Sequence, residues 1–160
     1  MFHAFGARSL SFASHVDPVL MNVMKEAIGI CPVDFGFTED QSRTVAQQNA
    51  KFHSGASQLP AGPKARHMIQ SDGFSKAVDA VPWVDGRFQW LWPQIFQIAF
   101  CVRQAAIRQN VRIRWGGVWD RNLNDIPATT PADIERAEQA YITRHPGRDF
   151  VDGPHYELPL

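Results

Sequence analysis

Turn-forming residues limit how long any helix or strand of this chain can be. Eleven Gly and eleven Pro are spread over 160 residues, so most ordered segments between them must be short. The hydrophobic fraction of 44% is enough for one packed core, whereas two half-length domains would bury too little apolar surface. We therefore predict a single α+β domain over residues 1–160, with a small antiparallel sheet and helices on one side.

Hydrophobic periodicity places the predicted elements. Asp17 followed by Pro18 is typical of a helix start, and Thr130 before Pro131 is typical of another. Residues 55–73 form a long irregular loop, which in a compact domain is often functional. The predicted helices cover 14–28, 44–53, 93–110 and 131–141, and the predicted strands cover 33–38, 77–83, 111–115 and the end of the chain after 153.

Charge and cysteine content exclude several classes of protein. The formal charge is zero, whereas nucleic-acid-binding proteins usually carry a basic excess, so no nucleic acid is expected as a partner. Cys31 and Cys101 lie in apolar surroundings and indicate buried free thiols, not a disulfide framework. The N-terminal residues do not resemble a signal peptide, and no apolar stretch is long enough to span a bilayer. We expect synthesis in the cytoplasm and no membrane insertion.

Histidines with nearby carboxylates are the candidates for metal chemistry. The chain has six His, but none lies in an HExxH or HxH pattern, so spacing alone is a weak signal. His67 ends the long loop, Asp79 lies in a predicted strand, and His155 begins the last one. Side chains at strand ends are held rigidly enough to bind a metal. Asp152, three residues before His155, is placed to accept a proton from a metal-activated water.

The order of several motifs resembles that of the zinc D,D-peptidase family. This family includes D-alanyl-D-alanine carboxypeptidases and the L-alanyl-D-glutamate endolysins of bacteriophages. Its Ser-x-His appears as Ala65-Arg66-His67, with Ala65 in place of the serine, and its Gly-x-Ala-x-Asp appears within residues 73–79. Residues 114–119 resemble its Trp-Gly-Gly-x-Trp segment, and Ser42-Arg43-Thr44 resembles another family feature. The most specific match is complete: Asp152-Gly153-Pro154-His155-Tyr156-Glu157.

The resemblance implies a hedgehog and D,D-peptidase-like zinc peptidase fold with one zinc ion. The implied ligands are His67, Asp79 and His155. The interval between the first His and the Asp is longer than usual, so Asp72 is a rival ligand. Asp79 is preferred because it keeps the local family pattern, and Lys76, which stands where many relatives have His, is not expected to bind the metal.

The resemblance also implies roles for residues around the metal. Asp152 would be the general base, and Arg43 would contact the substrate and stabilise the developing oxyanion. Apart from the resemblance, Glu157 could be a catalytic carboxylate, but its place on a strand after His155 favours a residue that orients a metal ligand through a hydrogen bond. Trp115 and Trp119 would either line a substrate groove or pack in the core, and the sequence leaves both readings open.

The implied function is that of a phage or prophage endolysin, a zinc-dependent hydrolase of peptidoglycan stem peptides that cuts the L-Ala–D-Glu bond. A monomer would reach periplasmic peptidoglycan after a holin opens the inner membrane. One alternative is a D,D-carboxypeptidase that removes terminal D-Ala, and another is a non-catalytic zinc-containing wall-binding or structural module. Residues 121–150, longer than the corresponding segment of the smallest relatives, are expected to form an inserted helix beside the site.

Overall fold

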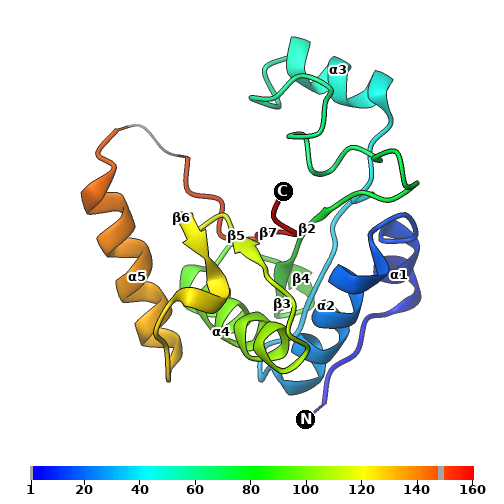
Figure 1. Ribbon diagram of the computed structural model, residues 1–160. Helices are drawn as coiled ribbons and strands as arrows, with labels where there is room; N and C mark the ends of the chain where they lie inside the picture. The colour runs from blue at the N-terminus through cyan, green and yellow to red at the C-terminus, as the bar shows by residue number, and fades with distance from the viewer. Residues whose placement is uncertain (1, 148–149) are drawn as a thin grey trace.

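The computed structural model describes residues 2–147 and 150–160, which form two small sheets, with α2 (Pro18–Ile30) and α4 (Trp92–Arg108) packed on one side of the sheet that contains β7 (His155–Glu157) (Figure 1). This arrangement confirms the predicted α+β class. The helices of the described residues are α1 (Ala7–Phe12), α2 (Pro18–Ile30), α3 (Val45–His53), α4 (Trp92–Arg108), α5 (Pro131–Arg144) and the short 3-10 helix η1 (Leu123–Asp125).

Both sheets are antiparallel. The first has the order β1-β3-β4, with β1 (Phe35–Gly36), β3 (Val81–Val84) and β4 (Arg87–Phe88). The second has the order β2-β7-β5-β6, with β2 (Ala77–Asp79), β7 (His155–Glu157), β5 (Arg114–Trp115) and β6 (Val118–Asn122). The C-terminal strand β7 thus lies between β2 and β5. Its register sets Asp79 opposite His155 and Arg114 opposite Glu157.

The predicted strand over residues 77–83 is divided between the two sheets. Ala80 separates β2 from β3, and its N–H donates to the carbonyl of Pro154 at 2.9 Å. The apolar residues continue from β2 into β3 without a break. The sequence therefore does not reveal that β2 pairs with β7 whereas β3 pairs with β1 and β4. The predicted strands over 33–38 and 111–115 shorten to β1 and β5, and β6 was not predicted.

Helix α2 begins and ends later than the predicted range 14–28. The side chain of Asp17 accepts a hydrogen bond from the N–H of Val19 at 2.8 Å, so the predicted cap is confirmed. The helix continues through Gly29 to Ile30, although Gly29 was expected to stop it. Helix α1 was not predicted, and it buries none of its residues, so no hydrophobic stripe marks it.

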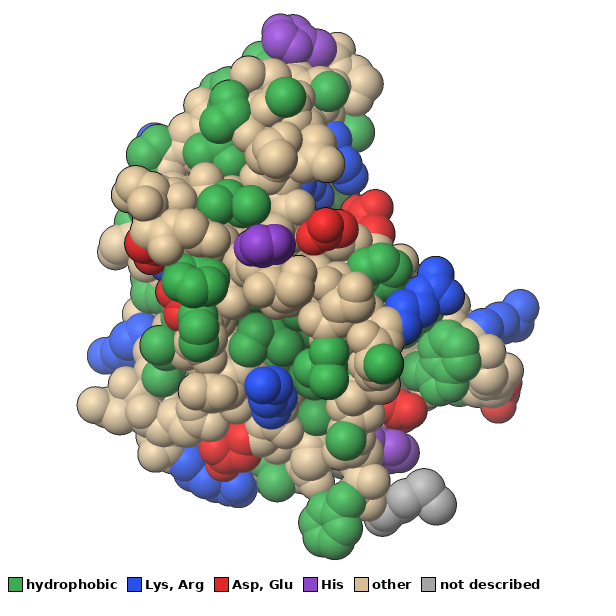
Figure 2. Space-filling view, turned by 90° about the vertical axis from the view of Figure 1, so that its right-hand side faces the viewer, with side chains coloured by type: hydrophobic (Ala, Val, Ile, Leu, Met, Phe, Trp, Pro, Cys, Tyr) green, Lys and Arg blue, Asp and Glu red, His purple; other side chains and the backbone are tan. Residues whose placement is uncertain are grey.

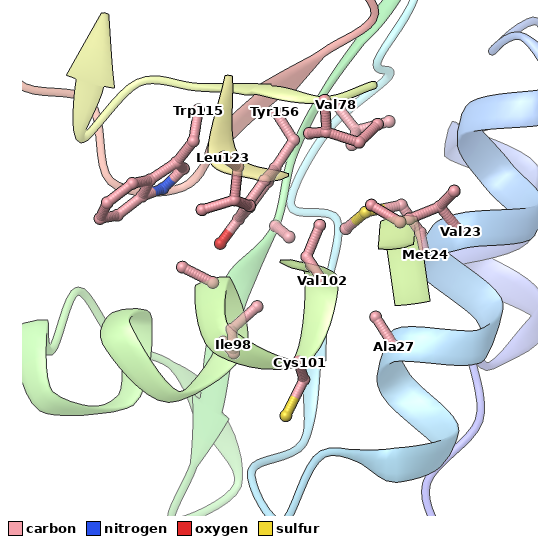
Figure 3. Close-up of a cluster of buried hydrophobic side chains, with 14 of the residues drawn as sticks. Val23, Met24, Ala27, Val78, Ile98, Cys101, Val102, Trp115, Leu123 and Tyr156 are labelled. Carbon is pink, nitrogen blue, oxygen red and sulfur yellow. The ribbon is translucent and has the colours of Figure 1, made fainter. Parts of the chain in front are cut away.

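The core lies between α2, α4 and the sheet that contains β7 (Figure 3). Val23 of α2, Ile98 of α4 and Tyr156 of β7 are all fully buried there. Burial of each such apolar side chain contributes roughly 1.5–3 kcal/mol, so this packing holds β7 rigidly. Cys31 and Cys101 are buried free thiols, as predicted.

Charged groups of both signs are interspersed on the face shown in Figure 2, among hydrophobic and uncharged side chains. Several arginines have acidic partners: Arg108 pairs with Glu26 at 3.1 Å, and Arg112 pairs with Asp125. Within the described part of the chain, no helix combines the length and apolarity needed to cross a bilayer.

Candidate active site

A cleft with a volume of about 690 Å³ lies between the sheet that contains β7 and the segment that follows α3. The sheet contributes Asp79, Trp119 and His155 to its lining. Residues 55–59 and 64–67 form the opposite wall, so the long loop predicted to be functional does border this cleft. A cleft that combines apolar walls with a few converging polar groups is the usual form of a small-ligand or peptide site.

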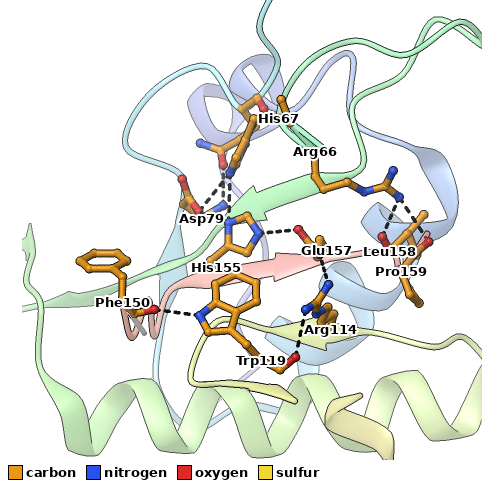
Figure 4. A network of polar contacts seen from close by, with 12 residues as sticks. Arg66, His67, Asp79, Arg114, Trp119, Phe150, His155, Glu157, Leu158 and Pro159 are labelled. Atoms are coloured by element: carbon orange, nitrogen blue, oxygen red, sulfur yellow. Dashed lines mark hydrogen bonds and ion pairs between the residues drawn. The ribbon is translucent and has the colours of Figure 1, made fainter. Parts of the chain in front are cut away.

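Three donor atoms meet inside the cleft (Figure 4). Nε2 of His67 lies 3.2 Å from Oδ1 of Asp79 and 3.3 Å from Nδ1 of His155. The third side of this triangle, from Nδ1 of His155 to Oδ1 of Asp79, is 3.1 Å. Zinc–ligand bonds of about 2.0–2.1 Å imply that tetrahedral ligand atoms are about 3.3 Å apart. The three donors therefore fit one face of a tetrahedral metal site.

Backbone pairing holds the three donor residues in place. Asp79 ends β2 and faces His155, the first residue of β7. His67 belongs to neither strand, but its carbonyl accepts from the N–H of Arg43 at 2.8 Å, and the carbonyl of Arg43 accepts from the N–H of Ile69 at 2.8 Å. The structure thus brings together His67, Asp79 and His155, which are far apart in sequence.

Each histidine is oriented through the ring nitrogen that points away from the donor triangle. Nδ1 of His67 donates to the carbonyl of Gln41 at 2.9 Å, because a carbonyl can only accept. Nε2 of His155 contacts a carboxylate oxygen of Glu157 at 3.0 Å, the contact expected of a residue that orients a ligand. In the neutral rings these partners take the single N–H outside the triangle, which leaves Nε2 of His67 and Nδ1 of His155 free to bind a metal.

Burial and neighbouring charges separate the pKa values of the two aspartates. Burial acts to raise the pKa of Asp79, but the two histidines outweigh it and hold that pKa well below its usual value. Burial is also the main reason that the pKa of Asp152 is raised, and the negative charge of Asp79 adds to this shift. Asp79 is therefore suited to bind a cation, whereas Asp152 is suited to accept a proton.

A close backbone approach positions Asp152. Its N–H donates to the carbonyl of Gly116 at 2.9 Å, and the N–H of Gly116 donates to the carbonyl of His155 at 2.9 Å. A Cβ atom on Gly116 would lie 2.2 Å from the carbonyl oxygen of Asp152. The first glycine of the Trp-Gly-Gly-x-Trp segment is thus required because a larger residue would displace the chain that carries Asp152 and His155.

Arg43 lines the cleft and is held by a residue that sequence reasoning missed. Its Nη1 donates to Oε1 of Gln48 at 3.3 Å, while Nε2 of Gln48 donates to Oγ of Ser57 at 3.0 Å and to the carbonyl of Leu59 at 2.7 Å. Gln48 is 1% exposed on a helix that is otherwise largely exposed. A single sequence gives no sign that this glutamine is buried, because the helix has no matching apolar stripe.

The two tryptophans have different positions. Trp115 is fully buried in the core, where its Nε1 donates to the carbonyl of Gly153 at 2.6 Å. Of the two readings for Trp115, the structure therefore supports core packing, because the ring lies against Phe96 of α4 and does not line the cleft. Trp119 lines the cleft, with its ring 5.4 Å from that of His155 and 5.4 Å from the guanidinium carbon of Arg114.

The rival ligand Asp72 lies outside the donor triangle. Its carboxylate pairs with Lys76, which also donates to Asp17 at 2.6 Å. The ammonium of Lys76 thus pairs with Asp17 and Asp72. Of the two aspartates, Asp79 is the one whose carboxylate lies with His67 and His155.

The predicted insertion over residues 121–150 contains α5, which packs against α4 and β6. The predicted helix is thus present and contacts a strand of the site's sheet, but no residue of α5 lines the cleft. Phe150, at the end of this segment, does line it, and its carbonyl accepts from Nε1 of Trp119 at 2.8 Å. Residues 148 and 149 of the predicted insertion lie outside the described part of the chain.

Three comparisons connect this site with known proteins. A sequence model of the family described as phage L-alanyl-D-glutamate peptidase matches residues 1–159. The L-alanyl-D-glutamate peptidase of Escherichia phage T5 is 27% identical over 121 residues, which are 75% of this chain and 84% of that protein. The crystal structure of the Serratia marcescens L-Ala D-Glu endopeptidase ChiX is similar with a TM-score of 0.68 and 27% identity, covering 98% of this chain and 90% of that chain.

Proposed function

The chain belongs to the phage L-alanyl-D-glutamate peptidase family, and from this membership we propose that it is an endolysin that cleaves the stem peptides of bacterial peptidoglycan. The proposed scissile bond is L-Ala–D-Glu, the bond in the names of the family and of both relatives. The observation that carries the proposal is the triangle of His67, Asp79 and His155 inside the cleft, with Asp152 on the same lining.

One zinc ion is the proposed cofactor. Two imidazole nitrogens and one carboxylate oxygen are a donor set that catalytic zinc sites use, and their separations of 3.1 to 3.3 Å suit tetrahedral geometry. When bound, zinc supplies Lewis acidity to the scissile carbonyl and lowers the pKa of a water ligand to about 7.

Asp152 acts as the general base in this proposal. It accepts a proton from the attacking water and passes it to the amine that leaves when the peptide bond breaks. The raised pKa of Asp152 supports this role because the carboxyl must hold the proton between the two events. A carboxylate with an ordinary or lowered pKa would release it to solvent more readily.

Arg43 and Trp119 complete the proposed site from two walls of the cleft. The guanidinium of Arg43 offsets the negative charge that develops on the carbonyl oxygen, and Gln48 fixes its direction. Trp119 presents an aromatic ring next to His155, where it contacts the substrate chain. Glu157 keeps the His155 ring aligned.

The proposed site of action is the periplasmic cell wall. A phage enzyme that is made in the host cytoplasm must cross the inner membrane to meet peptidoglycan, and a holin is the expected route. Action as a monomer is part of this proposal, because the donor triangle, Asp152 and Arg43 all come from one chain.

Digestion of purified Gram-negative peptidoglycan tests the function. Mass spectrometry of the products is expected to show new C-terminal L-Ala and new N-terminal D-Glu. Release of free D-Ala would instead identify a D,D-carboxypeptidase, and unchanged peptidoglycan would identify a non-catalytic module. Removal of metal with EDTA is expected to abolish cleavage, and added zinc is expected to restore it.

A further inference from the structure

A single glutamine outside the donor triangle contacts two of its three residues. Gln41 is 1% exposed and lies in the segment between β1 and α3, two residues before Arg43. Its main-chain carbonyl accepts from Nδ1 of His67 at 2.9 Å. Its side-chain Oε1 accepts from the main-chain N–H of Asp79 at 2.6 Å. The ring of one candidate ligand and the backbone of another are therefore held by the same residue.

The orientation of Gln41 is itself fixed. Its main-chain N–H donates to the carbonyl of Phe12 at 2.9 Å, and its Nε2 donates to the carbonyl of Glu39 at 2.6 Å. A flipped amide would set Nε2 against the N–H of Asp79 and Oε1 against the carbonyl of Glu39, so both bonds would be lost. The partners therefore allow one amide orientation only, and the residue has little freedom to move.

The contact with Asp79 replaces a bond that a neighbouring strand would otherwise supply. Asp79 is the last residue of β2, and the N–H of the next residue, Ala80, already turns to Pro154. A partly buried main-chain N–H still needs an acceptor, and here that acceptor is a side chain from a distant segment. The position of the Asp79 carboxylate thus depends on Gln41 as well as on strand pairing.

We propose that Gln41 is a positioning residue of the metal site, which sets the ring of His67 and the backbone of Asp79 for metal binding. This inference rests on the proposed function, because positioning has an effect only if these residues bind the ion. Loss of a partner that orients metal ligands typically weakens metal binding by about 10- to 100-fold. We expect a loss of this size when the side chain of Gln41 can no longer accept from Asp79.

Gln41→Met tests the proposal, because methionine has a similar volume but neither amide oxygen nor amide nitrogen. Gln89→Met is the matched control. Gln89 is a half-buried glutamine whose Nε2 donates to the carbonyl of Val84 at 2.9 Å, and it does not line the cleft.

Two measurements are made on the metal-free protein: zinc affinity by competition with a chromophoric chelator, and the free energy of unfolding in urea. The visible absorption spectrum of the cobalt-loaded protein adds a direct readout of ligand geometry. We expect zinc to bind Gln41→Met about 10- to 100-fold more weakly than wild type, with an altered cobalt spectrum. We expect Gln89→Met to bind zinc within about threefold of wild type.

Unchanged zinc affinity and an unchanged cobalt spectrum in Gln41→Met would overturn the inference, even if the variant were less stable. If that variant does not fold, Gln41→Asn takes its place, because its amide is one methylene too short to reach Asp79, and the same outcomes apply. Absence of zinc binding by the wild-type protein would instead refute the proposed metal site, and the inference with it.

Discussion

Gly116→Ala is the substitution for which the structure gives the most definite expectation. The new Cβ would lie 2.2 Å from the carbonyl oxygen of Asp152, whereas ordinary contacts begin at 3.4 Å. The chain that carries Asp152 must therefore move by about 1 Å, because the interior is already close-packed. A misplacement of about 1 Å in a catalytic group can lower the rate about 100-fold. We expect a loss of this size in kcat.

The same movement weakens the two hydrogen bonds that join Gly116 to Asp152 and His155, each 2.9 Å long. Each such bond contributes about 0.5–1.5 kcal/mol, so the free energy of unfolding should fall by roughly 1–3 kcal/mol. Gly29→Ala is the matched control, since nothing lies within 4 Å of its new Cβ and the residue is within α2. That change should stabilise the protein by about 0.5–1 kcal/mol and leave activity unchanged.

The assay measures the release of new amino termini from purified peptidoglycan, together with urea unfolding of each variant. Activity of Gly116→Ala close to that of wild type would show that the base is not positioned by this close approach. A loss of activity in Gly29→Ala as large as that in Gly116→Ala would show that the effect is unspecific.

Three further substitutions test separate parts of the structure. Asp152→Asn should lower kcat by about 100-fold or more while zinc affinity stays the same, and a matching loss of affinity would make Asp152 a ligand instead of a base. Tyr156→Phe should raise the free energy of unfolding by about 1 kcal/mol, because the buried hydroxyl has no hydrogen-bond partner among the described residues, and a decrease in urea unfolding experiments would contradict this. The N–H groups of Thr129 and Thr130 hold the pKa of Asp133 below its usual value, so its stabilising effect should be present at pH 7 and disappear as the pH falls below about 4. Melting temperatures of wild type and Asp133→Ala should accordingly converge at acid pH, and a constant difference would show that the charge of Asp133 is not the cause.

The short-range features of this protein could be predicted from the sequence. Asp17 begins α2 and Thr130 begins α5, because a helix start depends on a few adjacent residues. Asp152 and His155 could be singled out for the same reason: both lie in one intact hexapeptide, and the turn between them is local.

Features that depend on strand pairing could not be predicted from the sequence. By residue type Asp72 and Asp79 are equally good ligands, and only the family pattern favoured Asp79. The physical reason is the β2–β7 register, which joins residues 76 positions apart and sets Asp79 against His155. The same sheet turns Trp115 into the core, where a periodicity argument could not distinguish it from a groove residue.

The two buried glutamines show most clearly what only the tertiary structure decides. Gln41 and Gln48 are polar residues in segments without an apolar stripe, so by composition both belong on the surface. They are buried because the N–H of Asp79, the carbonyl of Leu59 and the side chain of Arg43, all outside their own segments or helix, supply hydrogen-bond partners. The sequence by itself determined where α2 and α5 begin and the chemical type of the donors. Which side chains meet at the cleft, and which residues hold them there, depends on long-range hydrogen bonds that exist only in the folded chain.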